Sequence, residues 1–220
     1  TVLTPDGYKA VFQTFSEGGW AGLGAPVEFG GMGLPHALDA AVGEMMTGAC
    51  PAFAMYPGLT RGAANVLSKF ASLDYRAMLC ERMYTGQWGG TMCLTEPGAG
   101  SDVGSNRTRA VPSDEPGVYM LEGEKIFISS GDNDLFENIV HLVLARLPGA
   151  PEGTRGLSIF MVPKHEFDFE SGELGARNGV YVEKLEEKMG IHGNATCALS
   201  FGARSPCKGW LLGEPGQGMS

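Results

Sequence analysis

The sequence has no excess of basic residues and no long apolar run. It holds 16 Lys and Arg against 25 Asp and Glu, a formal net charge of −9 over 220 residues. Proteins that bind nucleic acid or an anionic membrane surface usually carry the opposite balance. No apolar stretch approaches the ~20 residues that a membrane-spanning helix needs. The composition therefore argues against a nucleic-acid partner and against a membrane span.

Paired cysteine motifs and clustered metal ligands are also missing. The five cysteines, at positions 50, 80, 93, 197 and 207, are odd in number, and none is spaced Cys-x-x-Cys; the four histidines are scattered. Neither a disulfide framework nor a zinc site is indicated, and a cytoplasmic location fits this usage best. The chain begins at Thr1 without a signal peptide and ends in a loop-like stretch, so we expect both ends to be cuts.

The first third of the chain has helical spacing. After Pro35, a favourable first helical residue, apolar residues recur at i, i+3, i+4 and i+7. A second stripe covers residues 63–70, and a third helix is expected from an N-cap at Asp74 to a stop at Gly86. Core packing is the simplest interpretation of these stripes. The first two consist of Leu38, Ala41, Val42 and Met45, and of Ala63, Val66, Leu67 and Phe70.

Beyond Gly86 the pattern becomes that of short strands. Strands over 118–121 and 125–129 are expected to form a hairpin through Glu122-Gly123-Glu124, and residues 165–178 are expected as a surface excursion. Further strands are expected over 88–95, 139–147, 157–162, 180–182 and 196–201. Short strands separated by Gly and Pro favour an antiparallel barrel or sandwich. The fold class is therefore α+β, with helices first and a β-domain after about residue 87.

The densest chemical signal is the stretch from Met92 to Asp102, which runs from a strand into a Gly-rich turn. Glycine lets a flat or charged ligand approach the backbone, and Thr95 and Ser101 supply hydroxyl groups. An ordinary loop between strands is the alternative. A Rossmann site is rejected, because Val103 stands where its fingerprint needs the third glycine and no βαβ pattern surrounds it.

Two other segments carry chemistry-bearing residues. In the strand 125–129, Phe127 and Ser129 are expected on one face, where a ring ligand could pack on the first and bond to the second; a core Phe and a solvated Ser are the alternative. In the Gly-rich turn after Met189, His192 is more simply structural than catalytic. Cys93 and Cys197 lie in apolar strands and are interpreted as packing residues.

Together these segments, in this order and spacing, resemble the acyl-CoA dehydrogenase family. The run Leu94-Thr95-Glu96-Pro97-Gly98-Ala99-Gly100-Ser101-Asp102 matches the family's strongest signature. Residues 124–130, 187–191 and 211–214 match later landmarks, with Phe127 and Ser129 where Trp and Thr are commoner. Residues 19–26, 30–36 and 189–196, and the extra polar stretch 173–178, resemble the larger bacterial members, a subfamily that includes 3-methylmercaptopropionyl-CoA dehydrogenase.

The resemblance implies a division of the chain and a set of binding residues. Residues 1–87 would be an incomplete N-terminal helical domain, 88–215 the middle β-domain, and 216–220 the start of a missing C-terminal helical domain. FAD would be the cofactor, and Ser101 would also help to hold the thioester arm of the substrate. The flavin contacts would come from Met92, Leu94, Thr95, Gly100, Ser101, Phe127, Ile128 and Ser129.

The activity implied is α,β-dehydrogenation of an acyl-CoA thioester to the enoyl-CoA. The family's catalytic base is a Glu of the C-terminal domain, so no catalytic residue is assigned here, and Glu96 is interpreted as structural. Electron transfer flavoprotein and a homo-oligomeric assembly are the implied partners. An acyl-CoA oxidase, a flavin monooxygenase of the same fold and a non-redox binding or assembly module are the alternatives.

Overall fold

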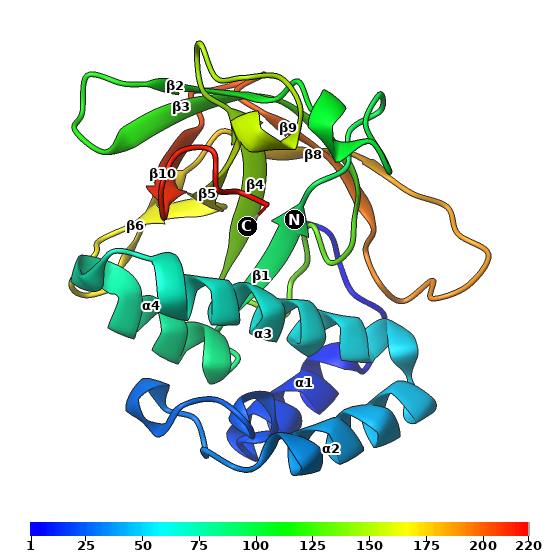
Figure 1. Ribbon diagram of the computed structural model, residues 1–220. Helices are drawn as coiled ribbons and strands as arrows, with labels where there is room; N and C mark the ends of the chain where they lie inside the picture. Colours follow the sequence, from blue (N-terminus) through cyan, green and yellow to red (C-terminus); the bar gives the residue numbers. More distant parts are fainter. Residues whose placement is uncertain (220) are drawn as a thin grey trace.

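The computed structural model describes residues 1–219, in which four α-helices precede a set of strands (Figure 1). The helices are α1 (Tyr8–Glu17), α2 (His36–Ala49), α3 (Pro51–Phe70) and α4 (Leu73–Tyr84). The strands are β1 (Trp88–Cys93), β2 (Arg109–Pro112), β3 (Val118–Ile128), β4 (Asn138–Arg146), β5 (Leu157–Pro163), β6 (His165–Phe167), β7 (Leu174–Arg177), β8 (Val180–Leu185), β9 (Cys197–Phe201) and β10 (Lys208–Leu212). The α+β class expected from the sequence is confirmed.

The main sheet is mostly antiparallel and partly closed. Its strand order is β1-β4-β5-β10-β3-β9-β8, and β2 pairs with both β3 and β4. Because β2 joins β4 through a single pair, Arg109 opposite Arg146, the path β4-β5-β10-β3-β2 returns to its start. The antiparallel arrangement that we expected holds for most of the sheet, but the pairing of β1 with β4 is parallel. The result is a small barrel-like sheet with β1 added at one edge.

The helices pack on the sheet through β1. Trp88, fully buried, lies in one apolar cluster with Leu67 of α3 and Leu79 of α4. The backbone of β1 approaches α3 closely, because Gly90 has no side chain and its amide donates to the Thr60 hydroxyl at 3.0 Å. A second cluster, built around Phe160 and Phe201, fills the space between the strands. The edge strand β1 thus lies closest to the helices, and β4 and β5 add Leu142 and Met161 to the same cluster.

The expected hairpin at Glu122-Gly123-Glu124 is wrong, because β3 runs without interruption through these residues. The first half of β3 pairs with β2 and β10, and the second half pairs with β9. Gly123 has a φ of 152°, and a Cβ there would lie 2.5 Å from the Thr108 hydroxyl. Glycine is therefore needed here because β3 passes close to Thr108 at the point where it changes pairing partners. It does not mark a reversal of the chain.

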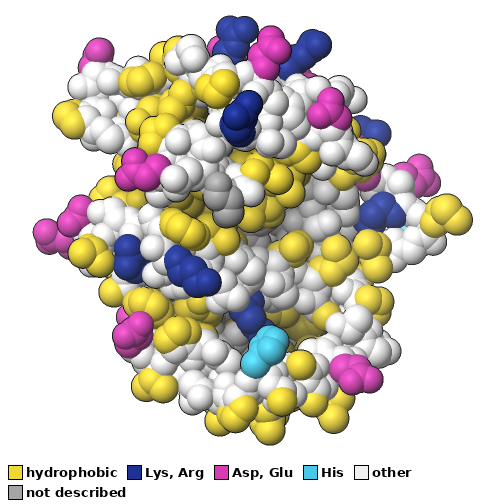
Figure 2. Space-filling model, viewed as in Figure 1, with side chains coloured by type: hydrophobic (Ala, Val, Ile, Leu, Met, Phe, Trp, Pro, Cys, Tyr) yellow, Lys and Arg dark blue, Asp and Glu magenta, His cyan; other side chains and the backbone are white. Residues whose placement is uncertain are grey.

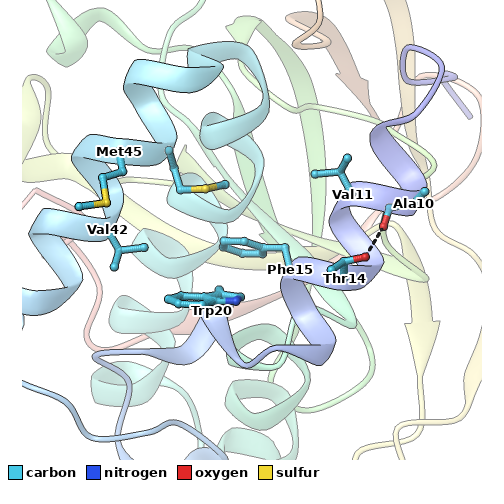
Figure 3. A pocket seen from close by; sticks show the side chains of 8 residues that line it. Ala10, Val11, Thr14, Phe15, Trp20, Val42 and Met45 are labelled. Carbon is cyan, nitrogen blue, oxygen red and sulfur yellow. Dashed lines mark hydrogen bonds between the residues drawn. The ribbon is translucent and has the colours of Figure 1, made fainter.

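The expected core role of the helical stripes is only partly right. Ala63 and Leu67 are buried, but Leu38, Met45 and Phe70 are exposed. Val42 and Met45 instead line an open apolar groove between α1 and α2 (Figure 3), and hydrophobic side chains gather over this lower part of the molecule in Figure 2. Helical periodicity identifies an apolar face without identifying what covers it.

Three smaller expectations also need correction. The N-cap of α4 is Ser72, whose hydroxyl accepts from the Asp74 amide, so Asp74 is the second helical residue. The stretch 165–178 is not a plain surface excursion, because β6 and β7 pair and Phe167 is buried against Trp88. The loop-like end of the sequence includes β10. The expected start of a further domain at 216–220 includes Ser220, which lies outside the described residues.

No helix within residues 1–219 is both long enough and apolar enough to cross a membrane.

We expect Gly90→Ala to destabilise the protein by about 1–3 kcal/mol, because overpacking a tight contact forces the neighbours apart. The added Cβ would lie 2.6 Å from the Ala63 Cβ and 2.6 Å from the Met83 methyl group. Gly62→Ala is the matched control, since that position of α3 has nothing within 4 Å, and it should stabilise by ~0.5–1 kcal/mol. Urea unfolding measures both, and an unchanged Gly90→Ala midpoint would contradict the close packing of β1 on α3.

Candidate functional site

The signature loop begins where β1 ends and turns at once. Glu96 and Ala99 exchange two backbone hydrogen bonds of 3.1 and 3.0 Å, which close a tight turn around Pro97 and Gly98. A Cβ built on Gly98 or on Gly100 would have nothing within 4 Å, and both residues are exposed. The turn therefore leaves a stretch of bare backbone open to a ligand.

The second segment leaves β3 in an unusual conformation. The register between β3 and β9 shifts between Lys125 and Ile128, and Phe127 takes a left-handed backbone with φ 57°. Its ring is 60% exposed, whereas Ile128 is buried, and Ser129 follows in a turn. The regular strand alternation from which we expected Phe127 and Ser129 on one face does not hold here, because the bulge interrupts it. The alternative of a core Phe is excluded.

Hydrogen bonds bring the two segments together. The Ile126 amide donates to the Thr95 carbonyl at 2.9 Å, and the Lys125 ammonium donates to the Leu94 carbonyl at 3.0 Å. Thr95 therefore lies beside the residue that precedes Phe127. Within the described part of the chain, the hydroxyls of Thr95, Ser101 and Ser129 have no hydrogen-bond partner, so each is free to bond a ligand. Met92 and Leu94 are half-buried beneath this edge.

A buried ion pair, which sequence reasoning missed, underlies this junction. Lys125 is fully buried, and its ammonium lies 2.8 Å from the Glu96 carboxylate and also bonds the Asn106 side chain. Burial alone raises the pKa of Glu96, but the hydrogen bonds from Lys125, Thr108 and Arg107 outweigh it and hold the pKa below its ordinary value. A lysine inside the apolar strand 125–129 was the available signal, since lysine is almost never fully buried unless it is paired.

Glu96 also fastens the chain that follows the signature. Its two oxygens accept from the Arg107 amide at 2.6 Å, the Thr108 amide at 3.0 Å and the Thr108 hydroxyl at 2.6 Å. Counting Lys125, four donors converge on one carboxylate. The structural role that we expected for Glu96 fits this geometry.

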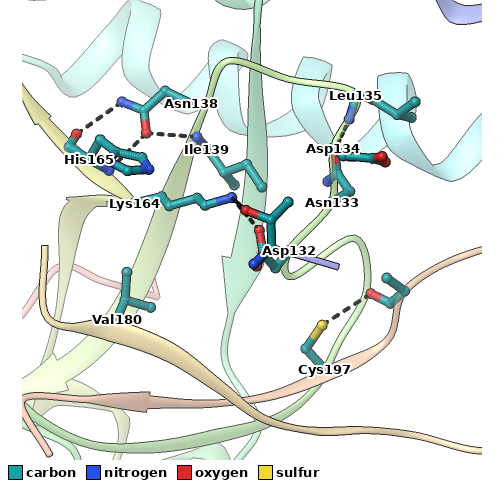
Figure 4. Close-up of polar contacts among 12 residues, drawn as sticks. Asp132, Asn133, Asp134, Leu135, Asn138, Ile139, Lys164, His165, Val180 and Cys197 are labelled. Carbon is teal, nitrogen blue, oxygen red and sulfur yellow. Dashed lines mark hydrogen bonds and ion pairs between the residues drawn. The ribbon is translucent and has the colours of Figure 1, made fainter. Parts of the chain in front are cut away.

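Other buried polar groups anchor the turn that follows Ser129. Ser130, also left-handed at φ 57°, donates its amide to the Asn194 side chain, whose amide group donates to the Ser130 hydroxyl at 2.8 Å. Asp132 forms an ion pair of 2.5 Å with Lys164, and both are buried (Figure 4). No pattern in the sequence links these positions, because 32 residues separate Asp132 from Lys164.

The cysteines and histidines singled out above do not form a reactive site. Cys93 is buried, which raises its pKa to about 12. His141, which we had not placed near Cys93, lies 4.0 Å from that sulfur and bonds the Thr91 hydroxyl at 2.7 Å, and burial lowers its pKa to about 3. Both groups therefore stay neutral. His192 is exposed, and its side chain has no ion pair or hydrogen bond within the described residues.

Comparison with protein families gives two matches that together cover most of the chain. Residues 4–87 match the model described as "Acyl-CoA dehydrogenase, N-terminal domain". Residues 91–203, more than half of the chain, match "Acyl-CoA dehydrogenase, middle domain". The resemblance inferred from the signature residues is thereby confirmed.

Curated relatives include a butyryl-CoA dehydrogenase of Syntrophomonas wolfei, 44% identical over 100% of this chain, and the 3-methylmercaptopropionyl-CoA dehydrogenase of Ruegeria pomeroyi, 45% identical over 99%. The chain spans 36% of the length of each. Among solved structures, an acyl-CoA dehydrogenase from Bacillus anthracis complexed with FAD has a TM-score of 0.77 and 28% identity, over 96% of this chain and 33% of that one. A structure described as the electron transferring flavoprotein of Acidaminococcus fermentans has a TM-score of 0.76 and 26% identity, over 95% of this chain and 50% of that one.

We expect Lys125→Met to destabilise the protein by about 3–5 kcal/mol, because it leaves the Glu96 carboxylate buried without its cation. The double variant Lys125→Met/Glu96→Gln should recover part of this loss. Lys184→Met is the matched control: this lysine pairs with Glu186 but is 66% exposed, and its removal should change little. Denaturant unfolding measures all three, and equal losses in the Lys125 and Lys184 variants would contradict the role given to the buried pair.

Proposed function

Since the chain belongs to the acyl-CoA dehydrogenase family, we propose that it forms the flavin- and thioester-binding part of an FAD-dependent acyl-CoA dehydrogenase. Such an enzyme oxidises an acyl-CoA to the α,β-enoyl-CoA. Because the chain spans 36% of its curated relatives, this activity is assigned to the whole protein and not to the 220 residues alone. The observation that carries the proposal is the junction at which the loop carrying Thr95 is hydrogen-bonded, through the Ile126 amide, to the segment carrying Phe127 and Ser129.

The groups at this junction suit an isoalloxazine ring. The ring has a flat apolar face and a polar edge, and the exposed Phe127 side chain offers a surface for the face. Within residues 1–219 the hydroxyls of Thr95 and Ser129 have no partner and are available for the edge, while the open turn at Gly100 admits a close approach of the backbone. Met92, Leu94 and Ile128 would support these contacts from the interior, and Ser101 would bond flavin or the thioester arm.

The bound flavin would supply the hydride-accepting chemistry. This chain's residues would bind, orient and exclude water. Thr95 and Ser129 would fix the polar edge of the ring by hydrogen bonds, and Phe127 would limit solvent on one face. Ser101 would place the acyl thioester beside the ring. The Lys125–Glu96 pair would hold the two binding segments at constant separation, since its donors and acceptors come from both.

The base that removes the α-proton is not assigned to this chain. Glu96, one of two carboxylates in the signature, accepts four hydrogen bonds that hold its pKa below the ordinary value, which makes it a poor proton acceptor at neutral pH. The other, Asp102, accepts from the Ser105 hydroxyl at 2.5 Å. We propose the domain division 1–87, 88–215 and 216–220, with the base supplied by a helical domain beyond it. The family matches over residues 4–87 and 91–203 support the first of these boundaries.

Partners and location follow from the same family. We propose electron transfer flavoprotein as the electron acceptor, a homo-oligomeric assembly, and the cytoplasm as the location. The likeness to the A. fermentans structure, described as an electron transferring flavoprotein, supports the first. The free cysteines of the described residues, four of them buried, accord with a reducing compartment. An oxidase or monooxygenase of the same fold would differ from a dehydrogenase because its reduced flavin would react rapidly with oxygen.

The first test is an anaerobic visible spectrum of the full-length protein titrated with short acyl-CoAs. We expect a yellow protein that one of them bleaches. Thr95→Val and Ser129→Ala should each weaken FAD binding about 2- to 10-fold, the range of one lost hydrogen bond. Thr47→Val, an exposed change on α2, is the control. A colourless protein that takes up no FAD would refute the proposal and favour a non-redox module.

The second test concerns the 220-residue chain by itself, which should show no dehydrogenase turnover with any acyl-CoA and an artificial electron acceptor. The physical reason is that the site residues described above bind and orient but include no available carboxylate base. Full-length protein assayed in parallel is the control. Robust turnover by the short chain would show that its own residues supply the base.

A further inference from the structure

The connection between β8 and β9 is fastened to the first turns of α3 by a buried tyrosine. In Figure 1 this connection, drawn in orange, extends from the sheet toward the helices. Tyr56 of α3 is 1% exposed, and its hydroxyl donates to the Gly193 carbonyl at 3.1 Å and accepts from the Ala195 amide at 3.0 Å. These two groups belong to the peptide bonds on either side of Asn194. One tyrosine hydroxyl therefore fixes the backbone around Asn194.

The side chain of Asn194 joins this connection to the turn after Ser129. It is buried, its oxygen accepts from the Ser130 amide at 3.0 Å, and its amide group donates to the Ser130 hydroxyl at 2.8 Å and to the Ala52 carbonyl at 3.4 Å. Both amide protons of Asn194 and the hydroxyl proton of Tyr56 are thus used inside the protein. Neither side chain has a proton left for a ligand, so its influence on ligand binding passes through Ser130.

A fixed Ser130 amide determines the backbone of Ser129. Since the peptide bond is planar, the direction of the Ser130 N–H also sets the direction of the Ser129 carbonyl. At the other end of this segment the Ile126 amide donates to the Thr95 carbonyl at 2.9 Å. Three residues therefore run between two fixed amides, and they include the exposed ring of Phe127.

The strain in this segment makes the second fixed point necessary. Phe127 and Ser130 both have a φ of 57°, a backbone conformation that persists in residues other than glycine only where the surroundings impose it. Ser130 is 2% exposed, so without Asn194 its amide would lose its partner in the interior. Removal of the Asn194 side chain therefore lets the peptide between Ser129 and Ser130 turn, and the Ser129 hydroxyl turns with it.

We propose that Asn194, held by Tyr56, is a positioning residue that aims the Ser129 hydroxyl at the polar edge of the flavin ring. The inference rests on the proposed function and deepens it, because it names the residues that give one of the flavin hydrogen bonds its direction. Asn194 and Ser130 lie 64 positions apart, and Tyr56 and Gly193 lie 137 positions apart. No local pattern in the sequence indicates either contact.

The experiment measures the Kd for FAD of the full-length protein in variants with and without Ser129→Ala. If Asn194 aims the Ser129 hydroxyl, the two substitutions remove the same interaction and their effects do not add. Asn194→Ala alone should raise the Kd about tenfold, and Ser129→Ala should then change it by less than about 1.5-fold. Tyr56→Phe, which removes a single hydroxyl, should also reduce the effect of Ser129→Ala.

Two buried residues of the same types are matched controls. The side chain of Asn178 bonds backbone groups at the end of β5 and the start of β10, and the Tyr84 hydroxyl donates to the Asn65 side chain at 2.7 Å. Asn178→Ala and Tyr84→Phe should lower the Tm about as much as the corresponding test variants. In both controls Ser129→Ala should keep its full effect on the Kd for FAD. The comparison separates positioning from a general loss of stability.

Each outcome decides the assignment. A full Ser129→Ala effect in the Asn194→Ala and Tyr56→Phe proteins overturns it, and so does an equal loss of that effect in the two controls. If Asn194→Ala does not fold, the Tyr56→Phe protein decides alone. Non-additive FAD binding in a protein whose flavin no acyl-CoA reduces supports the positioning role and refutes the proposed dehydrogenase. Flavin reduction by an acyl-CoA together with additive effects leaves the dehydrogenase standing and overturns the positioning role.

Discussion

The site depends on one buried ion pair between Lys125 and Glu96. Charges out of water are costly, and a pair of this kind persists where further hydrogen bonds satisfy both partners. Here they do, because the ammonium also bonds the Leu94 carbonyl and the carboxylate also accepts from Arg107 and Thr108. These contacts come from the end of β1, from β3 and from the approach to β2. Three parts of the chain therefore meet at fixed distances around one charge pair.

The contacts around the Lys125–Glu96 pair help to explain how the protein tolerates two residues with a strained backbone. Phe127 and Ser130 both take positive φ values, a conformation that costs a non-glycine residue of order 1–3 kcal/mol. On either side of them the backbone is anchored, by Lys125 on one side and by Asn194 and the Asp132–Lys164 pair on the other. The left-handed backbone at Phe127 points its ring toward solvent, although an aromatic side chain usually packs in the interior. Such an exposed aromatic is a common feature of ligand sites, and here it coincides with the free hydroxyls.

The sequence predicted the fold class and most strands because their signals are local. Branched apolar runs such as 157–162 identify strands by themselves, and the signature residues identify the family. The failures share a different cause. Glu122-Gly123-Glu124 resembles a turn, yet Gly123 is required by a close contact with Thr108, 15 positions away in the chain. Local residue spacing does not predict such a contact. Leu38 and Met45 show helical periodicity, which does not say whether their face is covered. The ion pairs that organise the site also join distant residues.

The same pair limits what chemistry the chain can perform. A general base needs an unpaired carboxylate or imidazole whose pKa lies near the working pH. Glu96 directly follows the binding residue Thr95, and its hydrogen-bonding capacity is used to hold the loop. His141 is buried and neutral, and it lies on β4 directly opposite Thr91 of β1. A titratable residue whose hydrogen bonds hold the site together is therefore unable to act as the catalytic base. The architecture therefore favours a division of labour, in which this chain orders the ligands and another segment moves the proton.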